Sequence, residues 1–186
     1  MPIVLIPLAK GYEELEAVTL IDVLRRANFT VITASLTEQQ QVLGSRGVRV
    51  VADVRLDDVM YDDFDMLLLP GGMSGATHLD DDPRIHAILK RLNQSDKAIA
   101  AICAAPLVLA HAGLLNGRTI TCYPDVLLAS EWPEVTFSDD AIVIDGNVLT
   151  SKGPGTAMDF ALTIIEYLSN KTTRDTVEAG LARSVF

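Results

Sequence analysis

Cys103 stands where an apolar run of strand length meets the start of a helix. Residues 98–102 precede it directly, and Ala104, Ala105 and Pro106 follow. Such a run suits an interior parallel strand, and proline fits a first helical turn because its missing N–H costs nothing there. Backbone N–H groups at a helix start favour negative charge, so the pattern predicts a partly ionised, nucleophilic and oxidisable thiol. The alternative is a packed small apolar residue, the commoner fate of free cysteine.

Carboxylates and glycines with useful chemistry lie in other segments. Glu13, Glu14 and Glu16 stand at the start of a predicted helix, where its dipole favours negative charge. At least two of them are expected to cap that helix, and only one needs to point into a crevice. Gly71 and Gly72 follow a strand, where the missing Cβ lets backbone N–H groups approach a ligand oxygen. The Gly-Pro-Gly segment 153–155 is also consistent with a tight turn into the last long helix.

The elements that would position these groups alternate along the chain. Asp145, Gly146 and Asn147 form a hairpin-turn signal, and Val48–Val54 is expected to be a hairpin arm or an edge strand. Leu15, Val18, Ile21 or Val23, and Leu24 mark the apolar face of the first helix. This alternation predicts an α/β fold, a single-domain, doubly wound, mostly parallel sheet sandwiched by helices over residues 1–186. The predicted strands are 3–8, 30–34, 66–69, 98–102, 118–121, 141–144 and 148–150, and the helices are 15–27, 83–92, 106–111, 156–168 and 172–181.

In that architecture, loops that leave the carboxyl ends of parallel strands emerge at one edge of the sheet. Four loops are therefore expected to be neighbours: 10–16, 70–75, the turn at Cys103, and 151–156. The thiol, the acidic segment and both glycine-rich turns would then share one crevice.

The bulk composition limits the partners. Fifteen Lys and Arg against twenty-five Asp and Glu give a net charge of −10, which repels phosphate backbones and anionic lipid. We expect no stable nucleic-acid binding and no membrane insertion, because the longest apolar stretch, 98–110, is too short to cross a bilayer. The N-terminal segment is expected to be a first strand and not a signal peptide. A cytoplasmic protein with two free thiols, Cys103 and Cys122, is predicted.

Taken together, five segments resemble the ThiJ/PfpI superfamily, most closely its protein deglycase branch. They are residues 8–16, 45–48, 68–72, 100–106 and 149–156, in the family's order and spacing. The resemblance implies a flavodoxin-like fold in which Cys103 is the nucleophile and oxidation site and Glu16 is a protonated acid hydrogen-bonded to it. It also implies oxyanion donors at Gly72 and Ala104, with Gly71 beside them, and a homodimer built partly through the first helix.

Two positions depart from the family. Tyr123 precedes Pro124 where many relatives have histidine, and a phenol is a poor general base at neutral pH. Ala104 occupies the position at which the protease-like branch carries histidine, which disfavours a Cys-His protease. His78, the one histidine expected near the four loops, does not restore that pair. Tyr123, Gly153 and Pro154 are candidate lining residues of the site.

The function expected from these residues is cysteine-dependent chemistry without a cofactor. No metal-ligand spacing, phosphate-binding lysine loop or dinucleotide fingerprint occurs in the sequence. A thiolate beside a carboxylic acid suits small reactive carbonyls or glycated thiols and amines, which is the family's glyoxalase and deglycase activity. A second hypothesis is an oxidative-stress sensor and redox-regulated chaperone, switched by oxidation of Cys103. A third is that the fold persists with negligible catalysis.

Overall fold

The computed structural model describes residues 1–183. The strands are β1 (Ile3–Leu8), β2 (Thr30–Ser35), β3 (Gln41–Leu43), β4 (Arg49–Val51), β5 (Val54–Arg55), β6 (Met66–Leu69), β7 (Ala98–Ile102), β8 (Thr119–Ile120), β9 (Thr136–Phe137), β10 (Ile142–Asp145) and β11 (Val148–Ser151). The helices are α1 (Glu14–Arg26), α2 (Leu56–Val59), α3 (Met73–Asp80), α4 (Pro83–Gln94), α5 (Pro106–His111), the 3-10 helix η1 (Pro154–Thr156), α6 (Ala157–Leu168) and α7 (Lys171–Gly180).

Seven strands form the central sheet in the order β10-β11-β7-β6-β1-β2-β5. All neighbouring pairs are parallel except β10 and β11, which form an antiparallel hairpin through the turn at Gly146. The α/β fold with a mostly parallel sheet is therefore confirmed, as is the hairpin predicted at 145–147.

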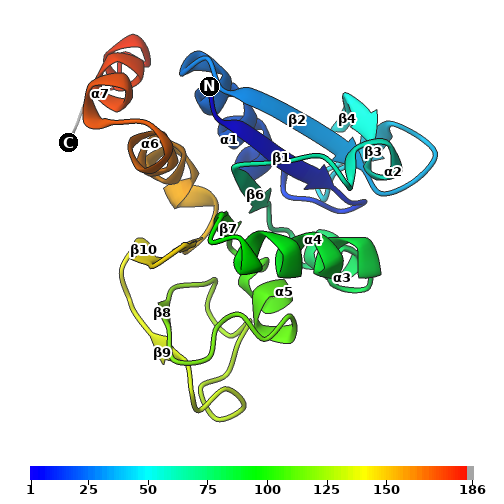
Figure 1. Cartoon of the computed structure of the whole chain (residues 1–186), viewed down its shortest axis with the longest axis vertical. Coiled ribbons are helices and arrows are strands. Elements are labelled where there is room, and N and C mark those ends of the chain that lie inside the picture. The colour runs from blue at the N-terminus through cyan, green and yellow to red at the C-terminus, as the bar shows by residue number, and fades with distance from the viewer. Residues whose placement is uncertain (184–186) are drawn as a thin grey trace.

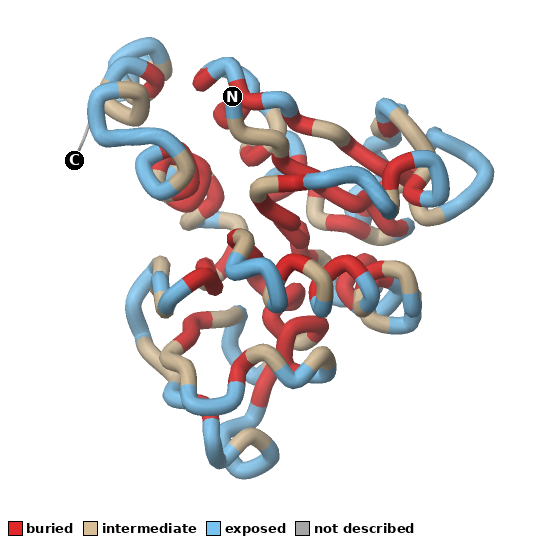
Figure 2. Tube along the Cα trace, viewed as in Figure 1, coloured by how far each residue is buried: buried red, intermediate tan, exposed pale blue. Residues whose placement is uncertain are grey.

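The interior strands are apolar because both of their faces are covered. Every residue of β6 and β7 is buried. Successive side chains alternate between two cores: Met66 and Leu68 pack on the side of α1 and α6, whereas Leu67 and Leu69 pack on the side of α4 and α5. Helices thus cover both faces of the sheet (Figure 1), and the buried part of the trace runs through the central strands (Figure 2).

Helix α4 shows how the sequence sets an element. Asp82 precedes it and accepts a hydrogen bond from the Arg84 N–H at 2.9 Å, while Pro83 occupies the first turn. Its apolar residues recur at helical spacing and are buried against the sheet. The predicted helix 83–92 is confirmed, with two further residues at its end.

The apolar face predicted for the first helix is confirmed at Val23 and Leu24, which are buried, but was wrong at Leu15 and Val18. Leu15 and Val18 are exposed, whereas Glu14, Glu16 and Leu20 are among the buried residues of α1. The two carboxylates are buried because backbone N–H groups of other segments donate hydrogen bonds to them, so the first turns of the helix direct Glu14 and Glu16 inward in place of Leu15 and Val18. Two large apolar side chains consequently face outward.

Three further segments differ from the prediction. Helix α3 begins inside the segment predicted as the loop 70–75. The segment 48–54 is divided between β4, an arm of the hairpin with β3, and β5, an edge strand of the main sheet. The predicted strand 118–121 shortens to β8, which pairs with β9 outside the main sheet. Residues 184–186 of the predicted domain lie outside the described part, in which no helix is long and apolar enough to span a bilayer.

Candidate active site

Cys103 lies in the turn between β7 and α5, as predicted. Its backbone has φ of 64°, a left-handed conformation that non-glycine residues rarely adopt. The Cys103 N–H donates to the Ser151 carbonyl at 2.9 Å, and the Cys103 carbonyl accepts from the Tyr123 N–H at 2.9 Å. Neighbouring segments therefore hold a strained conformation that fixes the thiol at the edge of the sheet, and such strain is typical of functional sites.

Gly71 stands between the thiol and a buried carboxyl group. The Gly71 N–H donates to Glu16 Oε2 at 2.8 Å. A Cβ at Gly71 would lie 2.6 Å from Glu16 Oε2 and 2.7 Å from Cys103 Cβ, distances too short for any side chain. The three residues are thus packed against one another, and only glycine leaves room for the other two.

Glu16 is the one acidic residue of its segment that reaches the thiol. Its side chain is fully buried, and Oε1 has no hydrogen-bond partner among residues 1–183. Burial raises the pKa of Glu16 to about 7, although the hydrogen bonds with Cys103 and Gly71 lower it in part. An acid with this pKa can both donate and accept protons near neutral pH.

The thiol is less acidic than the sequence pattern predicts. Burial and the adjacent Glu16 carboxylate together raise the pKa of Cys103 to about 12. The Gly72 and Ala104 N–H groups lower this pKa only in part. The prediction that the thiol is partly ionised was therefore wrong. Cys103 is only 8% exposed, and α5 is a short helix of 6 residues. At neutral pH the pair carries at most one negative charge, so ionisation of the thiol requires its proton to move to Glu16.

The Glu13 side chain makes no capping hydrogen bond to α1 although Glu13 is the N-cap residue, and the Glu14 carboxylate bonds to the β3–β4 turn. Glu14 Oε1 accepts from the Arg46 N–H at 2.7 Å and from the Val48 N–H at 3.2 Å. Ser45 Oγ lies 2.9 Å from Glu13 Oε2 and 3.0 Å from Glu14 Oε2. Burial would raise the pKa of Glu14, but the hydrogen bond from its own N–H, together with those from the β3–β4 turn, outweighs burial, and the pKa is lowered. Both residues hold the β3–β4 turn against the helix, a role that single-sequence reasoning could not assign because the partners are distant in the chain.

Gly72 and Ala104 both lie next to the thiol. The backbone N–H groups of both residues lower the pKa of the Cys103 thiol. Gly72 has φ of 85°, and a Cβ there would lie 2.4 Å from the Gly11 carbonyl oxygen. Gly72 also precedes α3, so the N-terminus of this helix lies at the site. Helix α3 was not predicted from the sequence, although the spacing of the buried Ala76 and Leu79 is typical of a helix.

Tyr123, Gly153 and Pro154 form a second group beside Cys103. They line an apolar hollow of about 270 Å³ together with Pro124 and the following turn. A Cβ at Gly153 would lie 3.2 Å from Tyr123 Cδ2, so the ring packs directly on that glycine. The Tyr123 side chain is 49% exposed. The structure therefore brings the three candidate lining residues together in one hollow, and the Tyr123 N–H bond to the Cys103 carbonyl connects this hollow to the turn that carries the thiol.

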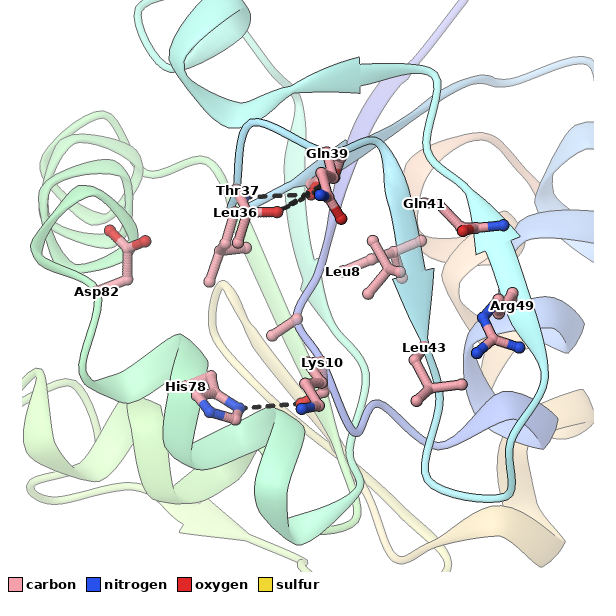
Figure 3. A pocket seen from close by; sticks show the side chains of 13 residues that line it. Leu8, Lys10, Leu36, Thr37, Gln39, Gln41, Leu43, Arg49, His78 and Asp82 are labelled. Atoms are coloured by element: carbon pink, nitrogen blue, oxygen red, sulfur yellow. Dashed lines mark hydrogen bonds between the residues drawn. The ribbon is translucent and has the colours of Figure 1, made fainter.

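His78 lies beside the first loop, as expected from the sequence. Its Nδ1 is 2.9 Å from the Lys10 carbonyl oxygen. On the Gly72 side of the thiol a cavity of about 430 Å³ is lined by residues that include Lys10, Glu13 and Arg46. Another cavity, of about 650 Å³, is lined by neither Cys103 nor Glu16 (Figure 3). Across residues 1–183, no group of three or more histidine, cysteine and acidic side chains is placed to hold a metal ion.

The raised pKa of Glu16 predicts a pH dependence of stability. The folded state binds the Glu16 proton more tightly than the unfolded chain, so this stabilisation is fully present below the usual pKa of 4.5 and is lost as pH rises through about 7. Its size is about 3 kcal/mol. The free energy of unfolding, measured with denaturant, should fall by about that amount between pH 5 and pH 8 in wild type, and this fall should be absent in Glu16→Gln. An identical pH dependence in both proteins would contradict the prediction.

Comparison with known proteins identifies relatives of the whole arrangement. The model of the DJ-1/PfpI family matches residues 3–167. "Glutathione-independent glyoxalase DJR-1.2" of Caenorhabditis elegans is 40% identical over 156 residues, which is 84% of this chain and 82% of that protein. The solved structure "Toxoplasma gondii DJ-1, oxidized" is 38% identical, with a TM-score of 0.92 and 100% of both chains covered.

Some relatives are much longer than this chain. "Protein DJ-1 homolog B" of Arabidopsis thaliana is 41% identical over 166 residues, 89% of this chain but 37% of that protein. The corresponding share of "Protein DJ-1 homolog A" is 42%. The chain thus spans about two fifths of the length of these two relatives.

Proposed function

Because this chain belongs to the DJ-1/PfpI family, we propose that it is a cysteine-dependent enzyme of the glyoxalase or deglycase type. Its substrates would be reactive dicarbonyls or their early adducts with thiols and amines. The observation that carries the proposal is the contact between Cys103, Gly71 and Glu16, in which a thiol and a carboxyl of pKa about 7 are held together. The name of the C. elegans relative supports the reaction class.

In the proposed reaction Cys103 attacks the aldehyde carbon of a dicarbonyl. The thiol proton passes to Glu16 as the sulfur–carbon bond forms, and Glu16 returns a proton to the carbonyl oxygen, which gives a hemithioacetal. In this proposal the Gly72 and Ala104 N–H groups, which already lower the pKa of the thiol, stabilise the developing oxygen charge. This cycle requires no external proton donor because Glu16 both accepts and donates.

Glu16 then moves a proton between adjacent carbon atoms. It removes the proton from the hemithioacetal carbon, and protonation of the neighbouring carbon leaves a thioester of a 2-hydroxy acid. The aldehyde carbon is oxidised and the ketone carbon reduced, so no external oxidant or cofactor is needed. Hydrolysis of the thioester releases the hydroxy acid and restores the thiol. For methylglyoxal the product is lactate.

The test is steady-state turnover of methylglyoxal by the purified protein, with lactate measured as product. A parallel assay uses a glycated amino acid after removal of free dicarbonyl, so that scavenging of the free compound is not counted as repair of the adduct. Sustained lactate formation supports the glyoxalase type, and release of the amino acid beyond the spontaneous rate supports the deglycase type. Absence of both contradicts the proposal.

An oxidation-responsive protective role is the second candidate. The similar Toxoplasma protein is named as an oxidized DJ-1, and in this chain the Gly72 and Ala104 N–H groups and the Glu16 acid surround the sulfur. These groups suit a sulfinate anion as well as an oxyanion. Suppression of aggregation that appears only after peroxide treatment, in a protein with negligible turnover, would favour this role.

We also propose a homodimer built through α1 and the β3–β4 hairpin. Leu15 and Val18 on α1 are exposed, as are Val48 and Val51 on the hairpin, and the Glu14 hydrogen bond to Val48 holds the two segments together. Exposed apolar side chains that are grouped in this way are typical of an interface. A second copy of the chain that covers this patch would bury all four side chains.

The dimer predicts a change in mass for one substitution. Val18→Glu should weaken self-association by about two orders of magnitude, since a charge would enter a buried apolar contact. Light scattering after size-exclusion chromatography should show a dimer for wild type and a monomer for the variant. Tyr61→Glu, which alters an exposed side chain outside the patch, should remain dimeric. A monomeric wild-type protein at tens of micromolar would refute the dimer.

A further inference from the structure

The proposed reaction assigns no role to the apolar hollow of about 270 Å³ that Tyr123 lines together with the turn 152–156. Both backbone polar groups of Cys103 are bound by the segments that form this hollow. The Cys103 carbonyl accepts from the Tyr123 N–H, and the Cys103 N–H donates to Ser151, which directly precedes the turn. None of the lining residues belongs to α1 or to the β3–β4 hairpin, which the proposed dimer covers. The hollow is thus fixed relative to the turn that carries the nucleophile.

The walls of the hollow are formed before a ligand binds. A Cβ at Gly153 would lie 3.2 Å from Tyr123 Cδ2, so the phenol ring rests on backbone that carries no side chain. Thr156 Oγ1 accepts from the Gly153 N–H at 3.1 Å and lies 2.6 Å from Ser151 Oγ, which holds the turn. Pro154 restricts the backbone further, because its ring fixes φ. Little ordering of the backbone is therefore needed when a ligand enters.

The lining suits an apolar group and offers an aromatic ring for it to contact. Tyr123 is 49% exposed, so much of its ring is open to a ligand. Lys152 is the charged residue of the lining, and its Nζ lies 3.0 Å from the Asp139 carbonyl oxygen and 3.5 Å from Asp139 Oδ1. The other lining residues are glycines, prolines and Thr156, whose hydroxyl bonds within the turn. An apolar group thus fits this lining better than a charged one.

The size of the hollow distinguishes between side groups of a substrate. A cavity of about 150 Å³ is enough to hold a benzene ring. The methyl group of methylglyoxal would leave most of the 270 Å³ unfilled. A phenyl group would fill more of it and would pair with the Tyr123 ring, a contact that contributes more than the buried area alone.

We propose that this hollow binds the side group of the substrate and makes the enzyme selective for aryl-substituted dicarbonyls, with Tyr123 as the residue that determines the preference. This selectivity rests on the proposed reaction at Cys103 and names the substrate class for it. The aldehyde carbon lies at the thiol, and the aryl group lies on the Tyr123 ring. For phenylglyoxal the same internal proton transfer, followed by hydrolysis with one water molecule, gives mandelate, and no oxidant is required.

The first test compares kcat/KM for phenylglyoxal with kcat/KM for methylglyoxal. The intrinsic reactivities of the two compounds differ, so their ratio is compared between variants, in which that difference cancels. Tyr123→Ala should lower the ratio of phenylglyoxal to methylglyoxal by at least about tenfold, since the ring that contacts the aryl group is lost. Tyr123→Phe, which keeps the ring, should retain the preference. Tyr61→Ala removes an exposed tyrosine outside the hollow and should leave the ratio unchanged.

A second measurement does not depend on turnover. Cys103→Ser removes the nucleophile, and the probes are 2-hydroxyacetophenone and hydroxyacetone, the neutral alcohols that correspond to the two dicarbonyls. The aromatic alcohol should bind at least about tenfold more tightly, because only its ring buries a large apolar area in the hollow. It should also shift the backbone amide NMR signals of Tyr123 and of the turn 152–156.

The two measurements distinguish failure of the aryl preference from failure of the proposed function. If neither dicarbonyl is turned over, the proposed function fails, and the binding comparison alone decides whether the hollow accepts an aryl group. Turnover of both compounds with the same ratio in wild type and Tyr123→Ala would overturn the aryl preference. Equal affinity for the two alcohols, or NMR shifts confined to other parts of the protein, would overturn it as well.

Discussion

Replacement of Cys103 by serine is expected to lower methylglyoxal turnover by at least about three orders of magnitude. Serine has nearly the same shape, and the hydrogen bonds to Ser151 and Tyr123 involve only the backbone of residue 103. The fold should therefore persist. The serine hydroxyl is a much weaker nucleophile than the thiol, and Glu16 is too weak a base to ionise it. Loss of a nucleophile in well-studied hydrolases costs up to about 10⁶ in rate.

Cys122→Ser is the matched control for that variant. Cys122 is half-buried, and burial raises the pKa of its thiol, but among residues 1–183 no carboxyl group contributes to that pKa as Glu16 contributes to the pKa of Cys103. The control should keep most of the wild-type turnover, and the thermal unfolding of both variants should show that they are folded. A fully active Cys103→Ser protein would sink the enzymatic proposal.

The central part of the fold could be predicted because its signals are local. The apolar runs that became β1, β6 and β7 are short, bounded by turn residues and buried on both faces. Their parallel order follows from alternation with helices, and that order brings Cys103, Glu16 and Gly71 to one edge. The positions of the candidate residues could thus be inferred without knowing any contact.

Long-range contacts explain what could not be predicted. The apolar pattern of α1 favoured Leu15 and Val18 as the buried face, but N–H groups near residues 46, 48 and 71 stabilise buried carboxylates there instead. The pKa of Cys103 depends on burial and on Glu16, so a helix-start argument alone gave the wrong direction. Such effects arise only when segments distant in sequence are in contact.

Replacement of Glu16 by glutamine is expected to separate ionisation of the thiol from catalysis. Glutamine can still accept the Gly71 hydrogen bond, but it cannot transfer a proton. Methylglyoxal turnover should fall by about two to four orders of magnitude, the usual contribution of general acid–base catalysis. Alkylation of Cys103 by iodoacetamide at high pH, where the thiol itself ionises, should be no slower than in wild type, since removal of the Glu16 charge also removes one cause of the raised pKa of Cys103. Glu16→Leu, which removes both polar atoms, should slow both reactions.

The pH profile of the wild type completes this test. The thiol–carboxyl pair must lose one proton before Cys103 can attack, so kcat/KM should rise as pH passes through about 7, the pKa of Glu16. In Glu16→Gln this rise should be absent, and the residual activity should increase only where the thiol itself ionises. If wild type and Glu16→Gln turned over equally, Glu16 would only position the thiol, and the proton transfers assigned to it would have to be withdrawn.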